Sequence, residues 1–121
     1  MNELVDELAS TAGIDDAVAE KTIGIMLDFL RSEGPPETVQ ALIDHIPGAE
    51  AAIAAARDGS GLSRLMGGGL MAVGTRLMGL GLTITDIQKI ARELFAFGRD
   101  KIGADRMNTI IAGTPGLRHF A

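Results

Sequence analysis

LMGGGLMAVGTRLMGLGL, residues 65–82, is the stretch that decides how the rest of the chain is interpreted. At 100° per residue, its larger apolar side chains fall on one stripe of a helix, and small residues occupy most of the remaining surface. Six glycines lie between Gly67 and Gly81. Each interior glycine costs about 0.5–1 kcal/mol relative to alanine, so such a helix needs neighbours packed around it. We therefore predict a buried, glycine-rich helix over residues 65–80 at the centre of the fold.

Three sharper interpretations of this stretch have less support. As a membrane span it is short, it carries Arg76 past its middle, and no Lys/Arg cluster flanks it. Residues 67–72, GGGLMA, match a dinucleotide fingerprint, but no predicted strand precedes them. A phosphate-binding loop fails because no Gly-Lys-Ser/Thr follows. A peripheral membrane protein that uses this segment stays open as a third class of function.

Composition restricts the class of protein. The 121 residues suffice for a single domain, residues 1–121, with a real hydrophobic core. Cysteine is absent, and no apolar run follows a charged N-terminal region, so we predict no signal peptide and a cytoplasmic location. The net charge of −5 and the presence of four phenylalanines as the sole aromatic residues argue against nucleic-acid binding.

The charges are divided between the two halves of the chain. Residues 1–58 contain 12 acidic and 3 basic residues, for a net charge of −9. Residues 59–121 contain 4 acidic and 8 basic residues, for a net charge of +4. The halves should attract each other within one chain or between chains. The alternative is that both halves carry solvated charged faces and that the difference in the sign of their charge arose by chance.

No segment alternates between apolar and polar residues, so we predict an all-α fold, a compact bundle of six or seven helices. For the helix that ends near Lys101, Thr85 with Gln88 has the spacing of a capping box, and Thr83 with Asp86 is the other candidate start. The predicted helices cover residues 2–11, 15–33, 36–46, 49–57, 65–80, 83 or 85–101, and 105–112.

Residues 81–116 are similar in sequence to residues 13–48, at an offset of 68 residues. Seven of the 36 positions are identical, and they fall at caps, core positions and turns. We interpret the segments as two helical-hairpin pseudo-repeats that enclose the central helix. The alternative is the general likeness of any two amphipathic helix pairs. The identical pairs are Gly13/Gly81, Lys21/Lys89, Phe29/Phe97, Arg31/Arg99, Ile43/Ile111, Pro47/Pro115 and Gly48/Gly116.

A family resemblance rests on the order of these motifs. The run LIDHIPGAE at residues 42–50 precedes the glycine-rich segment, and LGLT follows at residues 80–83. Over residues 13–116 the chain resembles small uncharacterised bacterial proteins of the VcgC/VcgE type. The resemblance implies a bacterial origin and an all-α fold. It carries no activity, so no site residue is transferred.

The sequence offers little for catalysis or metal binding. A zinc site needs about four ligands, and without cysteine it would depend on His45, Asp44 and distant carboxylates. Asp44 and His45 do not form an orienting pair, because adjacent helix residues point about 100° apart. His45 is better explained as a cation at a helix C-terminus. We predict no catalytic residue, no metal and no cofactor, and we lean towards a protein that is not an enzyme.

These observations favour a non-enzymatic interaction or scaffold protein that binds a protein partner or itself as a homodimer. The alternative is a carrier or sensor of an apolar small molecule or lipid. Its pocket would be lined by Met66, Met71, Met78 and Met107, with Arg76 as the charged member. Arg76 would otherwise extend to solvent or pair with an acidic residue of the N-terminal half.

Overall fold

The computed structural model describes residues 3–58, 70–114 and 116, and these ranges form seven α-helices and no strand. The prediction of an all-α bundle of six or seven helices is confirmed over these residues. None of the helices that the model describes is both long and apolar enough to cross a membrane. The helices are α1 (Glu3–Ala12), α2 (Asp16–Glu33), α3 (Pro36–Asp44), α4 (Ala49–Asp58), α6 (Leu70–Gly79), α7 (Ile84–Ile102) and α8 (Ala104–Gly113).

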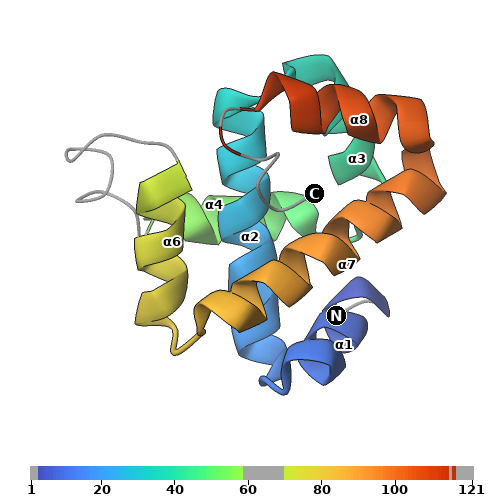
Figure 1. Cartoon of the computed structure of the whole chain (residues 1–121). Coiled ribbons are helices and arrows are strands. Elements are labelled where there is room, and N and C mark those ends of the chain that lie inside the picture. The colour runs from blue at the N-terminus through green and yellow to red at the C-terminus, as the bar shows by residue number, and fades with distance from the viewer. Residues whose placement is uncertain (1–2, 59–69, 115, 117–121) are drawn as a thin grey trace.

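Helix α2 is the centre of the bundle (Figure 1). It contacts α1, α3, α4 and α6, and every residue from Thr22 to Leu30 is buried. A helix that is buried all round belongs to the core. The structure differs here from the prediction for residues 65–80. Helix α6 begins at Leu70 and contacts α2 and α7 from one side of the bundle, and residues 65–69 lie outside the described part.

Helices α2 and α4 pack with their backbones close together. A Cβ added at Gly24 would overlap the carbonyl oxygen of Ala52. Only glycine at this position allows so close an approach. Most of the neighbouring residues of α4 are alanines, whose small side chains let the two helices lie close together. Ile53 supplies the large buried side chain of α4. The alanine-rich composition of α4 is therefore explained by the helix that it covers.

The structure at the link between α6 and α7 decides between the two candidate starts of α7. Gly81 has a φ of 93°, a left-handed conformation that favours glycine. The Thr83 hydroxyl then accepts a hydrogen bond from the Asp86 N–H, and the Asp86 carboxylate accepts one from the Thr83 N–H, both at 3.1 Å. The start at Thr83 is confirmed, and the start at Thr85 is wrong because residue 85 is already helical.

The helix bounds follow the 68-residue offset. Helices α2 and α7 begin at residues 16 and 84, and α3 and α8 begin at residues 36 and 104. Helices α1 and α6 each pack on both α2 and α7, while α3 packs on α8. An approximate twofold that exchanges α1–α3 with α6–α8 would produce these contacts. Common descent of the two halves stays a prediction.

Candidate functional site

The described residues among those predicted to bind a ligand lie in different surroundings. Met66 lies outside the described residues, as does the side chain of Met71 on α6. Met78, also on α6, is 48% exposed, whereas Met107 on α8 is fully buried and packs against Gly98 of α7. Neither Met78 nor Met107 lines the cavity or the groove described below. Met107 is a core residue.

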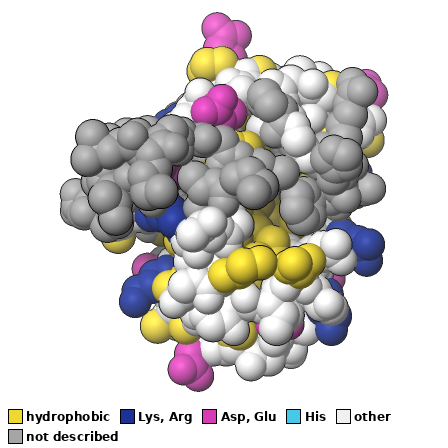
Figure 2. Space-filling model, turned by 60° about the vertical axis from the view of Figure 1, so that its left-hand side comes forward, with side chains coloured by type: hydrophobic (Ala, Val, Ile, Leu, Met, Phe, Trp, Pro, Cys, Tyr) yellow, Lys and Arg dark blue, Asp and Glu magenta, His cyan; other side chains and the backbone are white. Residues whose placement is uncertain are grey.

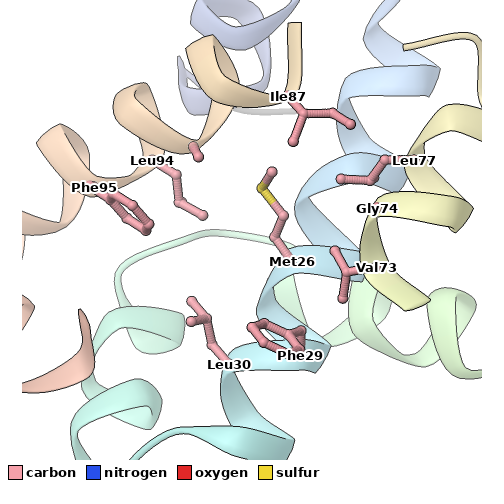
Figure 3. Close-up of a pocket in the computed structure, with 10 residues that line it drawn as sticks. Met26, Phe29, Leu30, Val73, Gly74, Leu77, Ile87, Leu94 and Phe95 are labelled. Carbon is pink, nitrogen blue, oxygen red and sulfur yellow. The ribbon is translucent and has the colours of Figure 1, made fainter. Parts of the chain in front are cut away.

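An apolar cavity lies instead where α2, α6 and α7 meet (Figure 3). Its volume is about 50 Å³, far below that of a pocket for a small-molecule ligand. Gly74 keeps one wall open, because a Cβ added there would meet none of the described atoms within 4 Å. The lining residues are Met26, Phe29, Leu30, Val73, Gly74, Leu77, Ile87, Ala91, Leu94 and Phe95.

A larger groove runs between α2, α4 and the end of α6. Its volume is about 580 Å³, and its lining combines alanines with three charged side chains, Glu20, Lys21 and Arg76. Ile25 and Leu80 provide its larger apolar surfaces. Small-molecule pockets usually measure about 300–1,000 Å³, so the groove, and not the cavity, has the volume of a ligand site.

Arg76 extends from α6 to the C-terminal end of α4. Its guanidinium donates a hydrogen bond of 2.6 Å to the carbonyl oxygen of Ala56. The last carbonyls of a helix lack partners within it and carry partial negative charge, so a cation is favourable there. Arg76 is half-buried, and its described partner is a backbone carbonyl and not one of the predicted carboxylates.

A polar cluster joins α2, α3 and α4. Arg31 donates two hydrogen bonds to the Glu50 carboxylate, at 2.5 and 3.2 Å, and another to the Gln40 side-chain oxygen at 2.8 Å. Gln40 in turn donates to Asp44 at 2.9 Å. The hydrogen bond to Glu50 raises the pKa of Arg31 above its ordinary value, although burial acts in the opposite direction. The cluster fixes α4 against α2, which is a structural role.

Two large apolar side chains on either side of the α6–α7 link are exposed. Met78 is 48% exposed near the end of α6, and Ile84 is 58% exposed at the first position of α7. Figure 2 shows apolar side chains open to solvent on the face that it turns forward. Contiguous exposed apolar patches mark binding surfaces, and these two residues are the candidates for such a patch at this corner. The sequence does not indicate that this corner is exposed, because an isoleucine at the start of a helix is ordinary and does not by itself show whether its side chain is buried.

The geometry of the described histidine, aspartate and glutamate residues gives little support for metal binding or acid–base chemistry. Within the described ranges, no three His, Asp or Glu side chains lie together as metal ligands. His45 is the C-terminal cap of α3, as its sequence position predicts, and His119 lies outside the described residues.

Neither a family model, a curated protein nor a solved structure matches this chain. The resemblance to proteins of the VcgC/VcgE type accordingly stays a prediction, and function has to be argued from the geometry.

Proposed function

We propose that this protein is a non-enzymatic interaction domain that associates with a second copy of itself. The observation that carries the proposal is the exposed apolar corner of Met78 and Ile84. Burying a large apolar side chain fully is worth about 1.5–3 kcal/mol, so two at one corner can anchor a contact. The small volume of the apolar cavity, about 50 Å³, also supports a binding surface over an enclosed ligand.

The test is light scattering with size-exclusion chromatography over a range of protein concentrations, at low and at high salt. The wild-type chain should move from monomer to dimer as concentration rises. Met78→Gln combined with Ile84→Gln should weaken the dimer, whereas Ala104→Gln combined with Ala112→Gln, at exposed positions of α8, should not. A wild-type chain that stays monomeric under all conditions would refute self-association.

The cell compartment belongs to the same proposal. We place the domain in the bacterial cytoplasm, where a chain without cysteine needs no oxidising environment. The bacterial assignment rests on the family resemblance alone.

The second candidate is a carrier of an apolar molecule with an anionic end, and the groove beside Arg76 favours it. Lys21 and Arg76 would hold the anion, and Ile25 and Leu80 would contact the apolar body. Calorimetric titration with decanoate tests this candidate. Arg76→Gln should abolish binding, while Arg106→Gln, an exposed position on α8, should not. No heat of binding to the wild-type chain would remove the candidate.

A further inference from the structure

Three cations form an exposed line along α7. Lys89, Arg92 and Arg99 are all exposed and lie within about 80° of one another around the helix, with exposed Ala96 among them. We call Lys89, Arg92 and Arg99 the basic stripe. Within the described part of the chain, no hydrogen bond or ion pair to these three side chains is present. The stripe therefore offers three positive charges to a partner.

The counterpart of this stripe on α2 is covered by a helix. At the 68-residue offset, Arg92 corresponds to Gly24 and Arg99 corresponds to Arg31. Gly24 lies against the backbone of α4, and Arg31 holds the Glu50 carboxylate of α4. The fold thus already contains one example of an acid-bearing helix seated at these positions. On α7, Arg92 prevents an equally close approach, but its long side chain can reach a carboxylate farther away.

Helix α1 carries the complementary charges. Glu3, Asp6 and Glu7 are exposed, and no basic residue occurs in α1. We call these three residues the acidic stripe. The acidic stripe spans about 6 Å along α1, from Glu3 to Glu7, and the basic stripe spans about 15 Å along α7, from Lys89 to Arg99. The two stripes are opposite in sign, and the acidic stripe is short enough to lie within the length of the basic one.

We propose that the acidic stripe of one copy docks on the basic stripe of a second copy, and that the reverse contact forms at the same time. Helices α1 and α7 pack against each other within each chain, so both stripes belong to neighbouring elements. A twofold axis can therefore make the contact twice, in the self-complementary manner of most homodimers. This inference rests on the proposed self-association and adds its orientation. A polyanion such as DNA is a poorer occupant, because the acidic stripe beside the site would repel it.

The experiment reverses each stripe separately and then mixes the two variants. Asp6→Lys with Glu7→Lys makes both stripes basic, and Arg92→Glu with Arg99→Glu makes both acidic. Like charges across an interface cost several kcal/mol, so each variant alone should dimerise at least about 100-fold more weakly than the wild type. An equimolar mixture should form a heterodimer within about tenfold of the wild-type Kd, because opposite charges again meet at both contacts.

The controls carry the same charge changes away from the stripes. Glu33→Lys with Glu37→Lys, and Lys101→Glu with Arg106→Glu, alter exposed residues, and both variants should dimerise like the wild type. Circular dichroism checks that each chain is folded. The measurements are sedimentation equilibrium and light scattering at low salt, followed by high salt, which should weaken a charge-directed dimer at least tenfold.

The outcomes separate this inference from the broader proposal. Reversed variants that dimerise normally, with dimerisation lost only in the Met78→Gln and Ile84→Gln chain, would overturn the stripe contact and leave self-association standing. A mixture that stays monomeric would also overturn it. A wild-type chain that is monomeric at every concentration would refute both. Binding of a short DNA duplex that depends on Arg92 and Arg99, in a chain that is monomeric, would assign the basic stripe to another partner.

Discussion

At the scale of single residues, two glycines with different surroundings have opposite roles. Gly24 lies against the α4 backbone, whereas Gly74 faces the open side of the apolar cavity. Gly24→Ala should destabilise the protein by about 1–3 kcal/mol, because the added methyl group forces two helices apart. Gly74→Ala should stabilise it by about 0.5–1 kcal/mol, because alanine favours the helix and no described atom lies within 4 Å of the added Cβ. Urea denaturation measures both values, and equal effects would contradict this packing.

Arg76 makes a second prediction at the residue scale. Its hydrogen bond to the Ala56 carbonyl joins α6 to the end of α4. Hydrogen bonds that involve a charged group contribute about 1.5–3 kcal/mol, so Arg76→Met, which retains the length of the side chain, should cost about 1–2 kcal/mol on this half-buried contact. Thermal denaturation tests this expectation. Arg106→Met on α8 is the control for loss of a charge alone, and a comparable loss there would assign the effect to net charge.

At the scale of elements, the start of α7 depends on one threonine. Thr83→Ala removes the acceptor for the Asp86 N–H and should cost about 1 kcal/mol. Thr85→Ala is the matched change two residues later. It should leave stability unchanged or slightly raised, because Thr85 is exposed within the helix and alanine is the better helix former. The denaturant midpoints of the two variants are compared. An equal loss of stability in Thr85→Ala would show that the N-terminal cap of α7 is not at Thr83.

The sequence predicts these elements well where a local signal exists. Gly34 ends α2 and Gly103 ends α7, and both residues are visible as breaks after apolar periodic runs. Periodicity shows which face of a helix is apolar, but it does not show which neighbour covers that face. For this reason the sequence does not show that α2, with buried Thr22 and Asp28, is covered on every face over residues 22–30. The bond from Arg76 to a backbone carbonyl also has no sequence signal, because every residue carries a carbonyl.

At the scale of the whole molecule, the two halves of the chain are joined by exchanged contacts. Helix α1 of the first half packs on α7, and α6 of the second half packs on α2. Each half therefore covers apolar surface of the other, so we expect one cooperative unfolding transition. The same reasoning predicts that a fragment of residues 1–58 is largely unfolded, since Leu4 and Leu8 of α1 belong to the core that the whole chain forms.

This prediction is checked with two spectroscopic probes on the full chain and with two fragments, residues 1–58 and residues 59–121. Circular dichroism at the helix band and methyl NMR signals should follow a single urea transition in the full chain. The fragment of residues 1–58 should give the spectrum of an unfolded chain, and adding residues 59–121 should recover helix content as the exchanged contacts form. Two separate transitions, or a stably folded fragment, would mean that each half has a core of its own. In that case the contacts between the halves would be docking contacts between small domains and not the source of stability.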